Sequence, residues 1–140
     1  MATLTTHLFD HAVTGAATWI DELSAELRTD DPREARRVLR AVLHAVRDRL
    51  EPNEAAQLAA QMPELVRGIY YEDWVPGRRA PRHRDEFLRA IAHEGRLAGA
   101  TEASFAAAAV MRVLRAHISE GEIADVLGVM PSELRELLDA

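Results

Sequence analysis

The sequence contains an internal repeat, because residues 17–70 align with residues 85–138 at an offset of 68 positions and without a gap. Of the 54 aligned positions 12 are identical, whereas the composition alone would give about four or five identities. The identical pairs are Glu26/Glu94, Arg28/Arg96, Glu34/Glu102, Ala35/Ala103, Ala41/Ala109, Val42/Val110, Arg47/Arg115, Glu54/Glu122, Ala56/Ala124, Met62/Met130, Pro63/Pro131 and Arg67/Arg135. Positions that differ mostly stay apolar, as in Trp19/Phe87. The chain is therefore predicted to contain one folding unit twice, related mainly through its hydrophobic core.

Each copy is predicted to form four helices. Apolar residues recur at helical spacing, and no window alternates with period two for long enough to indicate a strand. Asp31, Pro32 and Glu34 fit an N-cap, a first helical position and a capping box. Ser119 with Glu122 fits a second capping box. The expected helices cover residues 17–28, 32–50, 53–61 and 63–70 in the first copy and residues 86–93, 101–118, 120–127 and 131–138 in the second.

These helices predict an all-α protein with a single domain over residues 1–140. A unit of 54 residues can bury only a small core. We therefore expect two tandem copies of a four-helix unit, packed on each other with pseudo-two-fold symmetry into one compact bundle. The first repeat covers residues 17–70, a connector covers 71–84, and the second repeat covers 85–138. Residues 1–16 precede the first repeat and can form one or two helical turns.

The composition narrows the class of protein. A net charge of -6 argues against indiscriminate binding to polyanions. The absence of Cys excludes disulfides, thiolate nucleophiles and Cys-ligated zinc. No apolar run approaches the roughly 18 residues of a membrane span, and the first residues lack the basic and apolar regions of a signal peptide. All 17 basic residues are Arg, which together with abundant Ala indicates a GC-rich bacterial genome. We expect a soluble protein of the bacterial cytoplasm without membrane contact.

A basic stripe runs along the predicted helix 32–50. Within an arc of about 100° on a helical wheel lie Arg33, Arg36, Arg37, Arg40, His44 and Arg47. The five arginines are candidate contacts for an acidic partner, an anion or nucleic-acid phosphates, and the alternative is an ordinary solvated helix face. In the second copy Phe105 stands where the first has Arg37. This difference argues against nucleic-acid recognition by both copies.

The connector combines aromatic and basic residues. Tyr71 and Trp74 follow Tyr70 closely and precede an Arg-rich run over residues 78–84. Aromatic rings beside guanidinium groups are typical of stacking or anion-binding sites. Arg67, Tyr71 and Trp74 are therefore candidates for a ligand groove. The alternative is that the two rings attach the connector to the bundle.

No residue is predicted to be catalytic. The sequence lacks Gly-rich phosphate-binding, nucleophile-elbow and His-Glu-x-x-His patterns. His7 and His11 lie four residues apart, a spacing at which two imidazoles can share a metal, but no third ligand follows at a fixed distance. We therefore assign no metal site and no cofactor, and nothing in the sequence indicates an enzyme.

Four segments of the chain resemble a bacterial family known as domain of unknown function 2267. They are Arg47 to Leu50, Glu54 to Pro63, Arg67 to Pro76 and Ser119 to Ile123. The resemblance covers about Leu8 to Leu138. Where this chain has Asp73, a Gly is usual in the family. The resemblance implies a duplicated, all-helical fold in soluble prokaryotic proteins, with no assigned reaction, substrate or cofactor.

These observations favour a non-enzymatic helical module that binds a protein partner, and homo-oligomers are one form that this binding can take. Two alternatives remain open. One is binding of a small ligand or anion by the aromatic and Arg-rich connector. The other is nucleic-acid binding through the stripe from Arg33 to Arg47, against which the acidic net charge and the unequal copies argue.

Overall fold

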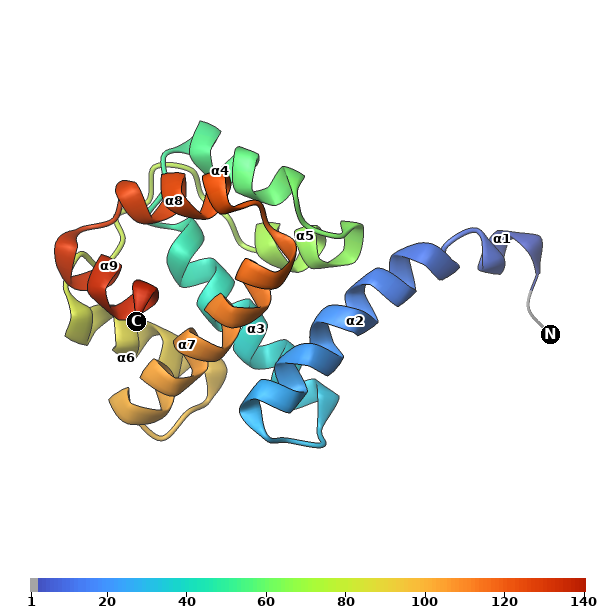
Figure 1. The fold of residues 1–140 in the computed structure, drawn as a ribbon, viewed down its shortest axis with the longest axis horizontal. Coiled ribbons are helices and arrows are strands. Elements are labelled where there is room, and N and C mark those ends of the chain that lie inside the picture. Colours follow the sequence, from blue (N-terminus) through green and yellow to red (C-terminus); the bar gives the residue numbers. More distant parts are fainter. Residues whose placement is uncertain (1–2) are drawn as a thin grey trace.

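The structure, a computed structural model, describes residues 3–140, which form nine α-helices and, over that range, no strand (Figure 1). The helices are α1 (Leu4–His7), α2 (Asp10–Leu27), α3 (Pro32–Arg47), α4 (Pro52–Ala60), α5 (Glu64–Tyr71), α6 (Arg84–Gly95), α7 (Ala100–His117), α8 (Glu120–Gly128) and α9 (Ser132–Asp139). The prediction of an all-α protein is confirmed. The predicted boundaries differ most at α2, which begins at Asp10 instead of residue 17, and at α3, which ends at Arg47 instead of residue 50.

The ends of the helices recur at the spacing of the sequence repeat. Helices α2 and α6 both end in a left-handed residue, Arg28 with φ 57° and Arg96 with φ 55°. At each end, the amide of the left-handed residue and the amide of the residue after it donate to carbonyl oxygens at the end of the helix. This pair of hydrogen bonds is the Schellman motif. Helices α4 and α8 begin 68 residues apart, as do α5 and α9. The repeated sequence therefore encodes repeated helix boundaries.

The predicted helix caps are confirmed in part. Asp31 accepts a hydrogen bond from the Arg33 amide, and Pro32 occupies the first turn of α3. Glu34, predicted to complete a capping box, instead accepts a hydrogen bond from the Thr29 hydroxyl. At α8 the Ser119 hydroxyl accepts from the Glu122 amide, whereas the Ser119 amide donates to Gln61 at the end of α4. A local contact with Thr29 at α3 and a tertiary contact with Gln61 at α8 thus replace half of each predicted capping box.

A single hydrophobic core joins residues from both repeats. Helix α3 packs against α2, α5, α6 and α7, and its apolar side is buried from Ala35 to Val46. Trp19 and Phe87, which are aligned in the repeat, are 2% and 0% exposed. The predicted compact arrangement is confirmed, since neither repeat has a core of its own apart from the other.

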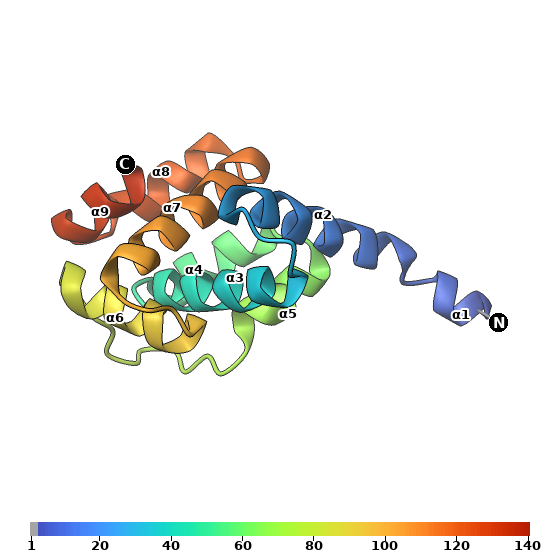
Figure 2. The same ribbon diagram turned by 90° about the horizontal axis from the view of Figure 1, so that it is seen from below.

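Two segments lie outside this packed body. Helix α1 and the first turns of α2 extend away from the other helices (Figure 1). The segment between α5 and α6 contains no helix and runs along one side of the molecule (Figure 2). Within residues 3–140 no single helix is long and apolar enough to cross a membrane, and α6 and α7 meet that test only as a pair bent by 83°.

Candidate functional site

The arginines of the basic stripe do not share one exposed surface. The side chain of Arg33 is 90% exposed and that of Arg36 is 52% exposed. Arg40 is 23% exposed at its side chain. Arg47 is only 1% exposed, so the prediction that it belongs to a solvent-facing stripe is wrong. The physical reason is tertiary, because the end of α5 and the start of the connector cover this turn of α3.

Arg47 holds the end of α5 against α3. Its Nη1 atom donates to the carbonyl oxygens of Tyr70 at 2.6 Å and Glu72 at 2.8 Å. Its Nε atom donates to Asp48 Oδ1 at 2.9 Å. The last carbonyls of a helix have no partner within the helix, and here a buried guanidinium supplies one. Arg47 is therefore a structural residue.

Arg40 and His44 of α3 form a charged cluster with Glu94 of α6. Glu94 Oε2 lies 3.1 Å from Arg40 Nη1 and 2.9 Å from His44 Nδ1. Arg40 also pairs with Glu72 and Asp73 at the start of the connector, both at 2.9 Å. The other ring nitrogen of His44 contacts the carbonyl oxygen of Ile69 at 2.8 Å. One cluster thus links α3 to α5, to α6 and to the connector.

The charges in this cluster stabilise one another. Burial alone would raise the pKa of the Glu94 carboxyl, but the contact with His44 and the positive charges of Arg40 and Arg47 lower it on balance. Hydrogen bonding to Glu72 raises the pKa of the Arg40 guanidinium, despite its partial burial. Both groups are therefore held in their charged forms by residues far away in the sequence.

The remaining arginines of the stripe are only partly free. Arg37 Nε donates to the carbonyl oxygen of Gly95 at the end of α6, at 3.0 Å. Arg36 lies 3.4 Å from Glu72, and Arg33 lies 3.4 Å from Asp31. Of the five arginines proposed to contact an anion along α3, only Arg33 and Arg36 therefore remain mostly exposed, and each lies beside an acidic residue. Their role as partner or anion contacts stays a prediction.

The three candidates for a ligand groove are not brought together as one site. Arg67 donates to the carbonyl oxygens of Ala59 and Met62, at 3.1 and 3.0 Å, and so closes the turn between α4 and α5. Tyr71 and Trp74 contact each other, with ring centroids 5.3 Å apart, and both pack partly against the core. This arrangement agrees with rings that attach the connector to the bundle.

The connector is held at both ends of its path. Asp73 has φ 58°, a left-handed conformation that favours Gly, so the chain turns sharply after α5. Further along, Arg49 Nη1 donates to the carbonyl oxygen of Ala80 at 3.1 Å. Burial, and to a lesser extent the nearby Arg82, lowers the pKa of Arg49. These contacts fix the path of the connector along the bundle.

The two N-terminal histidines lie on an exposed surface. His7 Nδ1 is 2.9 Å from Asp10 Oδ2, and His11 lies at the edge of a surface cavity. In the part of the chain from residue 3 onwards, no group of three His, Cys, Asp or Glu side chains gathers as metal ligands would. The residues described thus offer no metal centre to which function could be assigned.

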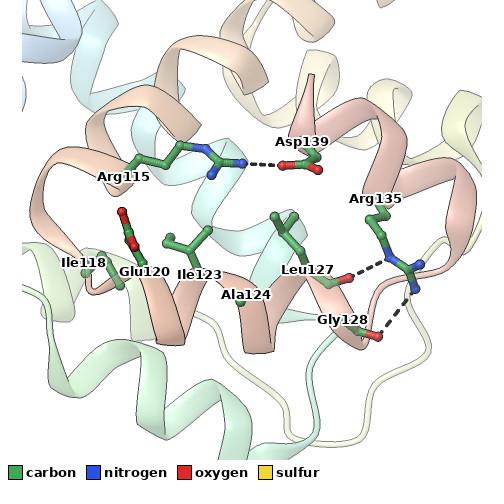
Figure 3. Close-up of a pocket in the computed structure, with 9 residues that line it drawn as sticks. All are labelled: Arg115, Ile118, Glu120, Ile123, Ala124, Leu127, Gly128, Arg135 and Asp139. Carbon is green, nitrogen blue, oxygen red and sulfur yellow. Dashed lines mark hydrogen bonds and ion pairs between the residues drawn. The ribbon is translucent and has the colours of Figure 1, made fainter.

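A groove of about 610 Å³ lies between α7, α8 and α9 (Figure 3). Ile123 and Leu127 of α8 point into it, and Ile118 lies at one end. Arg115 of α7 and Asp139 of α9 meet across it at 2.7 Å. Sequence reasoning missed this groove, because Arg115 was read only as the repeat partner of Arg47. Its volume lies within the range of about 300 to 1,000 Å³ that is typical of binding pockets.

The N-terminal arm, defined here as residues 3–15, is the other surface that sequence reasoning missed. Every residue from Thr3 to His11 is exposed. Leu4, Leu8, Phe9 and Val13 are 90%, 73%, 55% and 55% exposed. A cavity of about 560 Å³ opens at the base of the arm, between α2 and the turn at Met62 and Pro63. The helical spacing of the apolar residues in this segment is the sequence signal that could have indicated this surface.

We predict that Arg47 and its repeat partner Arg115 differ strongly in their contribution to stability. Arg47→Met leaves the buried carbonyl group of Tyr70 and the half-buried carbonyl group of Glu72 without this donor, so the free energy of unfolding should fall by about 2–4 kcal/mol. Arg115→Met removes an exposed ion pair and should cost less than about 1 kcal/mol. Urea denaturation followed by circular dichroism measures both values. Equal losses would contradict the structural role of Arg47.

We also predict that the contribution of Glu94 depends on pH. Glu94→Gln should lower the free energy of unfolding by about 1–3 kcal/mol at pH 7, because it removes the carboxylate that contacts Arg40 and His44. The pKa of Glu94 is lowered in the folded state. The stabilisation is therefore complete above the ordinary pKa of Glu and is lost as the pH falls through the folded value.

Urea denaturation between pH 7 and pH 3 tests this prediction, and the difference between wild type and Glu94→Gln should shrink towards zero at the acid end. Glu26→Gln is the matched control, because Glu26 forms an exposed pair with Arg112 and should contribute less than about 1 kcal/mol. A difference for Glu94→Gln that is the same at both ends of the range would refute the assignment.

Comparison with known proteins agrees with the resemblance noted in the sequence. The family described as "Uncharacterized conserved protein (DUF2267)" matches residues 16–137. The match includes the first repeat, the connector, all but the last residue of the second repeat and every residue of the charged cluster. No curated protein matches the chain. This chain belongs to the DUF2267 family.

Proposed function

We propose that this protein is a non-enzymatic interaction module that works in the bacterial cytoplasm and docks onto another protein through its N-terminal arm. The observation that carries the proposal is the exposure of Leu4, Leu8, Phe9 and Val13 on one projecting segment. Contiguous apolar groups on a surface typically mark sites of protein association. An acidic net charge of -6 is consistent with a protein partner.

The arm also lacks support from its own chain. Short helices without tertiary contacts are marginally stable in water, and the residues from Thr3 to His11 are all exposed. Docking onto an apolar face would supply the missing packing. The cavity at the base of the arm, which Trp19, Met62 and Pro63 help to line, offers a place for an apolar side chain of the same partner.

The rest of the molecule serves as a rigid scaffold in this proposal, built from two copies with pseudo-two-fold symmetry. Aligned residues that make equivalent contacts support that relation. Arg67 and Arg135 each donate to the carbonyl oxygen of a Met and to a carbonyl near the end of the preceding helix. Glu26 pairs with Arg112 at 2.6 Å, and the aligned Glu94 lies 2.9 Å from the aligned His44.

Nucleic-acid binding through α3 remains the weaker candidate. It requires several free arginines that neutralise phosphates, whereas Arg40 pairs with three acids and Arg47 is buried. Ligand binding by the connector has equally little geometric support, because Arg67 bonds backbone carbonyls. Protein interaction through the arm is the function that these contacts support best.

We predict that Phe9→Asp weakens association with the partner by more than about tenfold, because burial of a large apolar side chain contributes about 1.5–3 kcal/mol. Light scattering of the purified protein measures self-association. A photo-crosslinking residue placed at Leu8 identifies other protein partners in native lysate. Both measurements compare wild type with Phe9→Asp.

Phe105→Asp is the matched control, since Phe105 is an exposed phenylalanine on α7, far from the arm in sequence, and is 48% exposed. It should leave association unchanged. A wild-type protein that stays monomeric and crosslinks to no protein would contradict the proposal, and so would an association that Phe9→Asp leaves intact.

A further inference from the structure

The groove between α7, α8 and α9 combines an apolar floor with a displaceable ion pair. Ile118, Ile123 and Leu127 form the floor. Arg115 and Asp139 pair above it, and their side chains remain 43% and 59% exposed (Figure 3). An ion pair with this exposure contributes little to stability. A ligand that offers Arg115 another acceptor can therefore replace Asp139 at small cost.

The corresponding region of the first repeat shows what such a groove holds. The residue aligned with Arg115 is Arg47, which is 1% exposed because the polypeptide leaving α5 covers it. Arg47 donates there to the carbonyl oxygens of Tyr70 and Glu72. In the first repeat, the arginine at this position thus binds a turn of polypeptide. In the second repeat, the side chain of Arg115 is 43% exposed among the residues that the structure describes.

Aromatic side chains fill the first-repeat region. Tyr70 is fully buried, and its hydroxyl donates to the carbonyl oxygen of Ala55 at 2.9 Å. Tyr71 contacts Trp74, with ring centroids 5.3 Å apart and ring planes at 38°. The second repeat has Leu138 and Asp139 at the positions of Tyr70 and Tyr71. Leu138 and Asp139 are smaller than the two tyrosines, whereas Ile123 and Leu127 of α8 are larger than the aligned Ala55 and Ala59 of α4.

We propose that this groove binds an extended peptide of a partner protein that carries an aromatic residue next to an acidic residue. The aromatic ring would lie on Ile123 and Leu127, and a carboxylate of the peptide would accept from Arg115 in place of Asp139. The acid of the occupant follows from Arg115, whose present acceptor is a carboxylate; the groove is lined by the acid Glu120 as well. The inference relies on the alignment of the two repeats and on the contacts of Arg47 and Arg115. None of these contacts involves the N-terminal arm.

The probe is a capped heptapeptide with the sequence of residues 70–76, Tyr-Tyr-Glu-Asp-Trp-Val-Pro. It copies the segment that covers Arg47 and combines aromatic with acidic groups. It is titrated into the full-length protein with labelled Ile and Leu methyl groups, and chemical shifts are followed by NMR. We expect shifts that concentrate at Ile118, Ile123 and Leu127.

Arg115→Met should weaken peptide binding about tenfold, because a hydrogen bond from a charged group is lost. Arg112→Met is the matched control, since Arg112 lies on the same helix, is 49% exposed at its side chain and pairs with Glu26 outside the groove. It should change the affinity less than about twofold, as expected for an exposed ion pair. A peptide with Gln and Asn in place of its two acids should bind as weakly to wild type as the original peptide binds to Arg115→Met.

Three results would overturn the proposal: no methyl shifts at millimolar peptide, shifts that concentrate outside the groove, or equal affinity of wild type and Arg115→Met. The methyl spectrum of each free variant shows whether it is folded, so a failure to fold is recognised directly. The test does not involve Phe9 or Leu8, so its failure is distinguishable from failure of docking through the arm.

Discussion

The rest of the structure depends on how helix α3 keeps its charged side chains while packed against four other helices. Burying an unpaired charge is costly, and α3 carries Arg40, His44 and Arg47 on sides that its neighbours cover. Each of the three has an acid or carbonyl partner. Glu94, a residue of the second repeat, pairs with two side chains of the first. The cluster therefore fixes how the two repeats sit against each other as well as the path of the connector.

The sequence was sufficient to predict the helices and the core, because apolar spacing and cap residues are local signals. It was misleading for Arg47, since a helical wheel describes one isolated helix and carries no information on the chain that returns over it. Identical polar pairs were the better guide. Arg67 and Arg135 make equivalent bonds, and Glu26 and Glu94 both pair with the opposite repeat. The identity of Arg47 and Arg115 concealed a difference, because only Arg47 is covered.

The surfaces that favour an interaction role depend on tertiary structure. Leu8 and Phe9 are ordinary residues in the sequence, and they form the exposed apolar surface that we propose for docking because α2 begins early and extends beyond the body (Figure 1). The groove beside α8 lies where Leu138 and Asp139 stand in place of two tyrosines of the first repeat. The groove lies on a body held rigid by the shared core, as suits a binding site, whereas the arm projects from that body.

Native-state hydrogen exchange tests the central claim, that two repeats share one core and one stability. The slowest amides of α3, in the first repeat, and of α7, in the second, should exchange with the same free energy, equal to that of global unfolding. Their exchange should also respond equally to added denaturant. If the amides of α7 opened in a separate step of lower free energy while α3 stayed protected, the two repeats would be independent units and the account would be wrong.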